Sequence, residues 1–492
     1  MKSTLLVLRR SCLATPPPRR YDPPVRALRV PARRPFIPDS RNFPPEPGPA
    51  MRATKVLPLL LLLLVGCGAP PDEPPPNFLL ISLDTLRADH VGAYGYPRDT
   101  TPNIDRLAAR GTVFLNSFAQ APNTAPSHAS IFTSLYPTVH GIRSHGLNLD
   151  PSVETLAELL QNNGFATAAF SQLNGDTYRP GFDTYERLPS PFKRGNGLGD
   201  ISMVLDWLDH QAEKPFFLFL HSYDVHLPYN PLEEYLRLFE PDYQGGLPTT
   251  IDRKIIDRIN SSELEVTDED NRLIVSLYDA ELRRADEILG TLFEHLRSSG
   301  QFERTVIIFL ADHGEEFGEH GQMGRHSHTL YNELLHTPLI VAGPGVPEGL
   351  RIDTRVSNMD VAPTVLTAAG LDAPEAFLGR PLQPVWSGEE TKDREVVAER
   401  NNSMALFSGP YKYYKRERWG GTTGELYDLS TDPTEQRDIS LENPEVFRRL
   451  RSRLEEVERD LRLRALDHEQ PESEHLTEDE KERLRALGYL QT

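Results

Sequence analysis

Cysteine is nearly absent from this sequence, since Cys12 and Cys67 are the only two among 492 residues. A disulfide-stapled scaffold is therefore excluded, and the 38% hydrophobic content is that of an ordinary soluble protein with a sizeable core. The chain also has no internal repeats, no glycine-rich nucleotide loop and no nucleic-acid-binding motif. Functions that depend on those motifs are excluded with them.

Acidic residues outnumber basic ones after the first fifty residues. Residues 1–50 hold ten Lys or Arg against three acids, with proline throughout and no sustained periodicity, which predicts disorder. The whole chain carries −19; without the +7 of residues 1–50 and the +2 of residues 51–66, the remainder carries −28. This strongly negative charge after residue 66 argues against nucleic acid as a partner and against a basic membrane-binding face.

The longest apolar run, residues 56–65, is too short for a comfortable transmembrane helix. It follows a basic segment that starts at Met51, which predicts a signal peptide over residues 51–66. Leu64-Val65-Gly66-Cys67 resembles the cleavage box of bacterial lipoproteins, in which the cysteine is lipidated. We therefore expect Met51 to be the true start, with a tether at 67–76 and the membrane reached only through a lipid on Cys67. The expected location is the bacterial cell envelope; the alternative is an internal anchor helix after a cytoplasmic arm.

Short apolar segments alternate with amphipathic ones in the rest of the chain. Strands are predicted at residues 77–83, 112–118, 166–171, 215–221, 305–311 and 339–342, and helices at 129–135, 152–162, 199–210 and 273–298. This alternation predicts the α/β class, with a large, mostly parallel central sheet sandwiched by helices. We place the main domain at 77–385, a smaller C-terminal α+β subdomain at 386–440 and a charged helical tail at 441–492.

Three predicted strands end in polar clusters. Asp84 follows the first strand, the segment from His221 to His226 follows another, and Asp312 with His313 follows a third. Ligands bind at the carboxyl ends of strands in open α/β sheets, so these side chains are expected at one edge. Carboxylate oxygens and imidazole nitrogens suit Zn or Mn, and the pattern therefore predicts a divalent metal site.

Thr124 lies between a predicted strand and a predicted helix, so it is expected at a helix start. Pro126 fits the first helical turn, and the free N–H groups there attract anions. A nearby divalent metal would lower the pKa of the Thr124 hydroxyl and make it a nucleophile. The alternative is that Thr124 is a plain N-cap that stabilises the helix by ~1 kcal/mol.

Several motifs in the same order resemble the sulfatase family of the alkaline-phosphatase superfamily. They are residues 81–90, 101–108, 122–130, 311–321, 330–333, 337–340, 425–429 and 432–435. The resemblance covers residues 77 to about 440 and implies an alkaline-phosphatase-like fold with a catalytic domain at 77–385.

The resemblance also implies roles for individual residues. Asp84, Thr124, Asp312 and His313 would hold the metal, with Thr124 as the nucleophile. His226 and His326 would be catalytic, contacting the ester and protonating its leaving group, or would hold a second metal. Zn or Mn is expected over Ca or Mg, as one or two ions. Arg87 and Asp89 also match a motif, with a structural ion pair as the alternative.

The departures from the family pattern decide the predicted chemistry. Sulfatases carry a Cys or Ser that becomes formylglycine, in Cys/Ser-x-Pro-x-Arg; this chain has Thr124-Ala125-Pro126-Ser127-His128. A threonine cannot yield formylglycine, and the sulfatases' lysine-containing second signature is also missing. We therefore predict a metal-dependent hydrolase or transferase of phosphate esters, either phosphodiesters or phosphomonoesters, that acts through Thr124.

Two alternatives stay open. One is a sulfuric ester hydrolase that works without formylglycine, and the other is a degenerate, surface-anchored binding protein. The substrate is expected to be a small-molecule, glycan or lipid ester, and the sequence does not indicate an oligomeric state.

Overall fold

The computed structural model describes residues 74–173, 175–189, 198–211, 214–418, 421–465 and positions 468, 478, 481, 484 and 485. The predicted disordered segment at 1–50, the signal peptide at 51–66 and all but the end of the tether at 67–76 lie outside the described residues, as does most of the tail after 465. Within the described part, no helix has the length and apolarity needed to span a membrane.

An eight-stranded sheet forms the centre of the molecule, in the order β11-β2-β10-β7-β1-β6-β4-β5. Its strands are β1 (Asn77–Leu83), β2 (Gly111–Phe114), β4 (Ala166–Ser171), β5 (Thr184–Arg187), β6 (Phe216–Ser222), β7 (Thr305–Leu310), β10 (Leu339–Ala342) and β11 (Leu350–Ile352). Among the described strands of this sheet, β10 alone runs antiparallel to its neighbours. The predicted large, mostly parallel sheet is confirmed.

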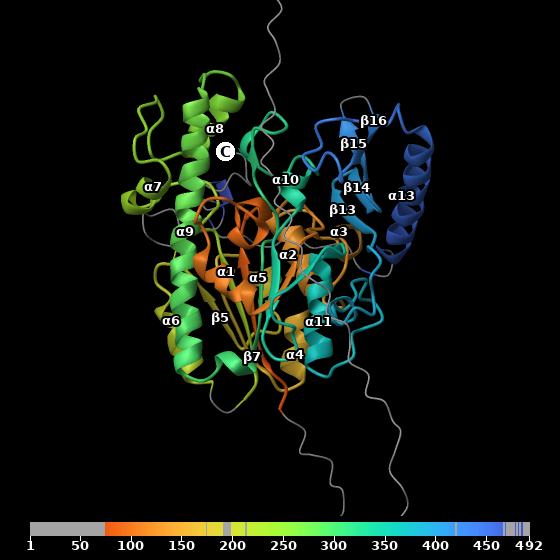
Figure 1. Ribbon diagram of the computed structural model, residues 1–492. Coiled ribbons are helices and arrows are strands. Elements are labelled where there is room, and N and C mark those ends of the chain that lie inside the picture. Colours follow the sequence, from red (N-terminus) through yellow and green to blue (C-terminus); the bar gives the residue numbers. More distant parts are fainter. Residues whose placement is uncertain are drawn as a thin grey trace, which may run out of the picture. The chain divides into compact units, whose positions relative to one another are not determined.

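Helices cover both faces of the sheet because its strands are apolar on both sides (Figure 1). In β1, Leu79 and Ile81 join one core, and Phe78 and Leu80 join the other. The first core contains residues of α1 (Pro102–Ala109), α6 (Ser202–Asp209) and α9 (Asp268–Ser298). The second contains residues of α2 (Thr124–Thr133), α4 (Leu156–Asn162) and α11 (Val361–Ala368).

Several predicted boundaries were wrong, and two of them have a clear physical reason. The single strand expected at 112–118 is two, because the chain leaves β11 at Leu115 and turns, so that β3 (Ser117–Phe118) pairs with β12 (Val356–Ser357). The helix α9 begins at Asp268 and not at residue 273. Thr267 caps it in a capping box with Asp270, and the acidic first turn favours an early start.

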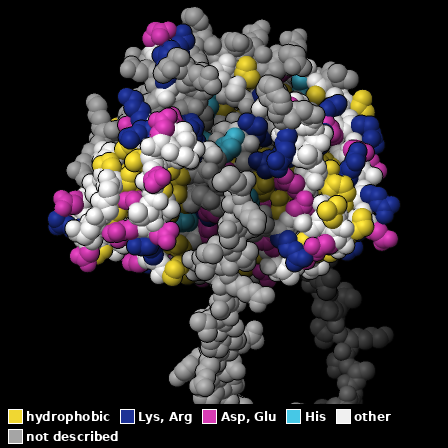
Figure 2. Space-filling model, turned by 90° about the horizontal axis from the view of Figure 1, so that it is seen from above, with side chains coloured by type: hydrophobic (Ala, Val, Ile, Leu, Met, Phe, Trp, Pro, Cys, Tyr) yellow, Lys and Arg dark blue, Asp and Glu magenta, His cyan; other side chains and the backbone are white. Residues whose placement is uncertain are grey.

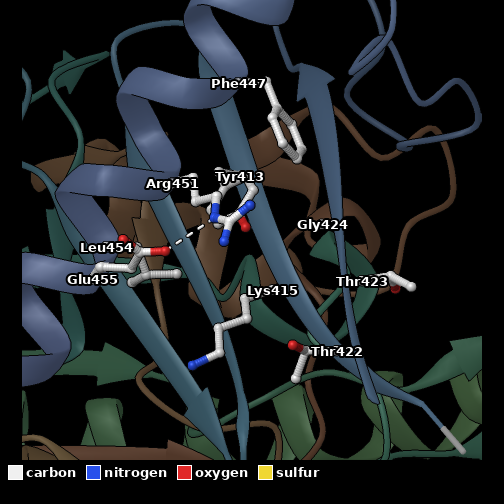
Figure 3. Close-up of a pocket in the computed structure, with 9 residues that line it drawn as sticks. All are labelled: Tyr413, Lys415, Thr422, Thr423, Gly424, Phe447, Arg451, Leu454 and Glu455. Carbon is white, nitrogen blue, oxygen red and sulfur yellow. Dashed lines mark hydrogen bonds and ion pairs between the residues drawn. The ribbon is translucent and has the colours of Figure 1, made fainter. Parts of the chain in front are cut away.

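A four-stranded antiparallel sheet forms the C-terminal part, in the order β13-β14-β15-β16. Its strands are β13 (Val396–Arg400), β14 (Ser403–Ser408), β15 (Tyr411–Arg418) and β16 (Gly421–Asp428), and α13 (Pro444–Arg464) packs on it. A cavity of about 140 Å³ lies between β15, β16 and α13. Figure 3 shows the side chains that line it. An ion pair from Lys415 to Glu458 links this sheet to α13, and a second, from Arg451 to Glu455, lies along the helix itself.

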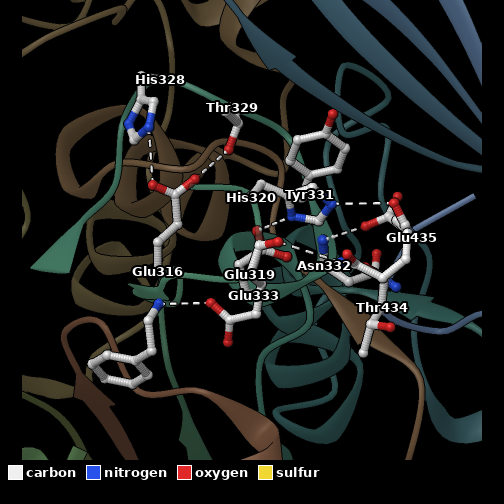
Figure 4. A network of polar contacts seen from close by, with 12 residues as sticks. Glu316, Glu319, His320, His328, Thr329, Tyr331, Asn332, Glu333, Thr434 and Glu435 are labelled. Atoms are coloured by element: carbon white, nitrogen blue, oxygen red, sulfur yellow. Dashed lines mark hydrogen bonds and ion pairs between the residues drawn. The ribbon is translucent and has the colours of Figure 1, made fainter. Parts of the chain in front are cut away.

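A buried ion pair within the C-terminal part contacts the main domain through Asn332. Lys412 Nζ lies 2.7 Å from Glu435 Oε1 with both side chains at 0% exposure, and 3.1 Å from Asn332 Oδ1. Figure 4 shows Glu435 and Asn332 within a wider polar network, in which His320 stacks on Tyr331. Because both charges are out of water, each depends on the other for compensation.

Replacing Lys412 by Met is therefore expected to lower the free energy of unfolding by about 3–5 kcal/mol, since the Glu435 carboxylate would stay buried without a cation. Urea unfolding measures the effect. The double variant Lys412→Met/Glu435→Gln should recover part of the loss. Equal unfolding midpoints for Lys412→Met and the wild type would contradict the expected role of this pair.

Candidate active site

The three strands that were predicted to end in polar clusters are neighbours in the sheet. β1 lies between β6 and β7 and is parallel to both, so their carboxyl ends meet at one edge. Asp84 follows β1, Asp312 and His313 follow β7, and His221 lies at the end of β6, opposite Ser82. The topology therefore brings together side chains from segments far apart in the sequence.

Asp84, Asp312 and His313 form one buried cluster. One ligand atom from each lies within 4.8 Å of the others, the only such trio found among the described residues. Asp84 Oδ1 and Asp312 Oδ2 are buried and accept no hydrogen bond from any described residue. Burial raises the pKa of Asp84 to about 6, although His313 opposes the shift, and burial also raises the pKa of Asp312.

This arrangement fits a divalent cation. Two buried carboxylate oxygens without donors and one imidazole nitrogen are the hard-oxygen and nitrogen donor set that Zn or Mn accepts. His313 presents the right nitrogen, because its Nδ1 donates a hydrogen bond to the carbonyl of Gly314 at 2.9 Å, which leaves the lone pair on Nε2.

A cation that binds this cluster should stabilise the fold. Adding Mn²⁺ or Zn²⁺ to chelator-treated protein is expected to raise the free energy of unfolding by about 2.7 kcal/mol at a hundredfold excess over Kd. Thermal unfolding with and without the ion measures the gain. Asp312→Asn, which removes one carboxylate charge, should lose most of it; equal gains for this variant and the wild type would place the bound ion elsewhere.

Thr124 is the first residue of α2 and is fully buried beside this cluster. Its Oγ1 lies 3.3 Å from His313 Nε2, and contact with it lowers the pKa of Asp84. The alternative of a plain N-cap is wrong, because Asn123 holds the N-cap position and no side chain caps the helix. The Thr124 hydroxyl therefore faces the charged cluster and does not serve its own helix.

His226 and His326 both lie in this site. The His326 ring centroid is 5.0 Å from that of His226 and 4.7 Å from that of His313. His226 Nδ1 donates to the carbonyl of Leu227, and His326 Nδ1 lies 3.1 Å from Glu315 Oε1. Burial holds the pKa of both imidazoles well below its usual range, so both are neutral with the lone pair on Nε2.

His221, from the polar segment expected at this edge, and three residues that were not predicted as site residues lie around the cluster. His221 Nε2 lies 3.3 Å from Asp84 Oδ2, and His128 donates from Nδ1 to the carbonyl of Thr124 and accepts from Ser82 at Nε2. Burial lowers the pKa of His221 to about 4 and that of His128 to about 3. Glu315 is buried. Burial, together with the nearby His326 and His313, lowers the pKa of His145 to about 3. His221 could be found from the sequence because it is a polar residue at the end of an otherwise apolar strand.

Arg87 and Asp89 form an ion pair, which was the alternative to a role in the site. The Arg87 guanidinium contacts both carboxylate oxygens of Asp89, with Nη2 2.7 Å from Oδ2, and also contacts Glu319 and the carbonyl of Glu315. Arg87 thereby ties the first strand end to the loop that follows Asp312 and His313.

The sulfatase family model matches residues 76–371, and the model of the N-sulphoglucosamine sulphohydrolase C-terminal region matches residues 318–460. The chain belongs to the sulfatase family. The resemblance inferred from the motifs is thus confirmed, and with it the coarse activity of a sulfatase-superfamily hydrolase.

Individual relatives of this sulfatase-family protein are distant but extend over most of its length. It is 24% identical to a Delta 4,5-hexuronate-2-O-sulfatase of Bacteroides thetaiotaomicron over 421 residues, 77% of this chain and 87% of that protein. Phosphonate monoester hydrolase of Agrobacterium radiobacter superposes with a TM-score of 0.65 at 21% identity, over 78% of this chain and 96% of the other. A protein whose structure was solved with its substrate D-glucosamine-2-N,6-O-disulfate superposes with a TM-score of 0.66 at 19% identity. The match covers 79% of this chain and 98% of the other. The predicted alkaline-phosphatase-like fold is confirmed.

Proposed function

We propose that this sulfatase-family protein cleaves phosphate esters through Thr124. The observation that carries the proposal is the Thr124 hydroxyl, buried at a helix start 3.3 Å from His313 Nε2, beside Asp84 and Asp312. The likeness to a phosphonate monoester hydrolase supports a phosphorus centre on this fold.

The chemistry of threonine supports phosphorus over sulfur. A hydrated aldehyde such as formylglycine carries two hydroxyl groups, so that one can form the ester and the other can expel it by breaking a carbon–oxygen bond. Thr124 has a single hydroxyl group, and an ester formed on it must be opened by attack at the phosphorus or sulfur atom itself. Phosphorus accepts two successive in-line attacks of this kind.

Asp84, Thr124, Asp312 and His313 would hold the divalent cation, with Zn or Mn as the ions that suit these donors. When bound, the cation lowers the pKa of the hydroxyl group and offsets negative charge on the phosphoryl oxygens. Asp84 is oriented for this role by His221, which lies 3.3 Å from its second oxygen.

In the first step, Thr124 gives up its proton to solvent and its oxygen forms a bond to phosphorus. The bond from phosphorus to the leaving oxygen breaks, and that oxygen keeps the electron pair and takes a proton from solvent. In the second step, water or an acceptor alcohol attacks the phospho-threonine and frees Thr124. Because His226 and His326 carry their lone pairs on Nε2, their geometry favours the roles of base for the attacking water or of ligand for a second cation.

A second candidate is cleavage of sulfate esters by the same Thr124. The family match and the sulfatases among its relatives favour it. The third alternative, a binding protein without turnover, gains no support from a site that retains Asp84, Asp312 and His313 together.

Parallel assays of the purified protein with Mn²⁺ or Zn²⁺ on bis-p-nitrophenyl phosphate, p-nitrophenyl phosphate and p-nitrophenyl sulfate test the proposal. A phosphoester is expected to turn over faster than the sulfate ester, and the better phosphoester distinguishes diesterase from monoesterase. Turnover of the sulfate ester alone would overturn the proposal in favour of the second candidate.

A further inference from the structure

A second cavity lies directly beside the Thr124 loop, and the steps above do not use it. Its volume is about 190 Å³, and it is lined by Asn123 and Pro126, which flank Thr124, together with Arg143, Ser327, Glu399 and Arg400. This space admits a group far larger than one water molecule. Figure 2 shows Lys and Arg side chains gathered beside a histidine near the middle of the face seen from above.

Glu399 offers this cavity a buried acceptor. The residue is 2% exposed, and its Oε2 accepts from the N–H and the hydroxyl of Thr138 at 2.8 and 2.6 Å and lies 3.4 Å from Arg143 Nη1. Its Oε1 is buried and has no hydrogen-bond partner among the described residues. A buried carboxylate oxygen without a donor costs free energy, which a ligand hydroxyl group would recover.

Arg400 brings an uncompensated positive charge. It ends β13, its Nε donates to the carbonyl of Ser327, and no described carboxylate lies within the 4.0 Å of an ion pair. Because Glu399 already pairs with Arg143, the positive charge of Arg400 has no carboxylate to balance it among the described residues that line the cavity. A half-buried guanidinium without a carboxylate partner is suited to bind an oxyanion through two parallel hydrogen bonds.

The cavity and the reaction centre share one backbone connection. The N–H of Ser327 donates to the carbonyl of Pro122 at 2.9 Å, which fixes the loop between His326 and His328 against the loop of Thr124. Ser327 Oγ is buried and has no described partner, so it adds a third unused polar atom beside Glu399 Oε1 and the Arg400 guanidinium. A group held in this cavity would be adjacent to an ester bound at Thr124.

We propose that this cavity binds the alcohol part of the substrate, and that this part is a polyol bearing a second anionic group. The oxyanion would bind Arg400, and a neighbouring hydroxyl group would donate to Glu399 Oε1. This inference rests on the proposed function for the place of the ester, but the cavity's ligand chemistry follows from its own residues. Arg400 and Glu399 would then determine specificity from the C-terminal sheet.

Isothermal titration calorimetry tests the proposal without turnover when every titration uses the Thr124→Ala background. Glucuronate and glucose 6-phosphate are the anionic probes, with carboxylate and phosphate as the two sources of the oxyanion, and glucose is the neutral control. Arg400→Gln is expected to weaken binding of the better anionic probe at least tenfold and to leave glucose binding within twofold. The matched variant Arg448→Gln, at an exposed arginine of α13, should change neither.

Either of two results would overturn the proposal: no binding of either anionic probe, or equal binding in the Arg400→Gln and Arg448→Gln variants. Thermal unfolding of Arg400→Gln checks that the variant folds, and Arg400→Lys, which keeps the charge, should recover part of the affinity. Because the readout is binding, loss of phosphoesterase activity in the assays above would overturn the proposed function and leave this result standing.

Discussion

Alanine at position 124 is expected to lower kcat/KM for the best phosphoester by roughly 10⁴–10⁶-fold, the scale observed when an enzyme loses its nucleophile. The methyl side chain cannot form the covalent ester, whereas Asp84, Asp312 and His313 remain in place. Because three of the four expected ligands remain, the variant should still bind the cation when Mn²⁺ or Zn²⁺ is in excess, and turnover is compared under that condition. Mass spectrometry of acid-quenched wild-type enzyme should find phosphate on the peptide that contains Thr124, and the variant should show none.

Two further variants make this result specific. Thr124→Ser keeps a hydroxyl group and should retain measurable turnover. Thr133→Ala removes a buried threonine hydroxyl from the same helix and should leave turnover unchanged, because this hydroxyl bonds only to backbone, donating to the carbonyl of Ala129 and accepting from the N–H of Leu135. If Thr124→Ala were as active as Thr133→Ala, Thr124 would not be the nucleophile.

The second large effect is expected for Asp84→Asn. Asparagine has almost the same shape but no negative charge, so the cluster would lose one of its two carboxylates and its cation affinity should fall by more than about 100-fold. Turnover should fall with it. Elemental mass spectrometry after dialysis measures the loss of bound metal. The loss of turnover is measured as kcat/KM with excess Mn²⁺ or Zn²⁺.

His221→Gln provides the graded comparison. His221 touches Asp84 and not the expected cation position, so its loss should cost about 10–100-fold in metal affinity, less than the loss of Asp84. Asp183→Asn, at a carboxylate that binds Gln161 and Thr167, is the matched control and should keep the wild-type metal content. Wild-type metal content in Asp84→Asn would contradict the assigned cluster.

The central part of the fold could be predicted because its strands are strongly patterned. The strand at 77–83 is nearly all apolar and is followed directly by Asp84, and the structure places β1 at those residues. The same contrast marks Asp312 after β7. Since parallel strands put their carboxyl ends at one edge, the sequence alone was sufficient to bring Asp84, Asp312 and His313 together.

The rest of the site depends on packing that local patterns do not record. His128 lies in a helix and His145 in a loop, and nothing in their neighbours indicates that either meets the histidines from other strands. The helix start expected at Thr124 from Pro126 is confirmed, although the segment predicted as helical from its residue pattern was 129–135. Glu399 and Arg400 come from a strand in a different sheet, so their proximity to Asn123 follows only from the tertiary structure.

The order of strands in the central sheet has a consequence for biosynthesis. β1 emerges first from the ribosome, yet one neighbour begins 139 residues later, at Phe216, and the other 228 residues later, at Thr305. Until both are made, at least one edge of this apolar strand is unpaired, and such segments aggregate. At a synthesis rate of about 5–20 residues per second, this vulnerable period lasts more than ten seconds. A holding chaperone during that interval should therefore raise the yield of folded protein more than the stability of the finished fold would suggest.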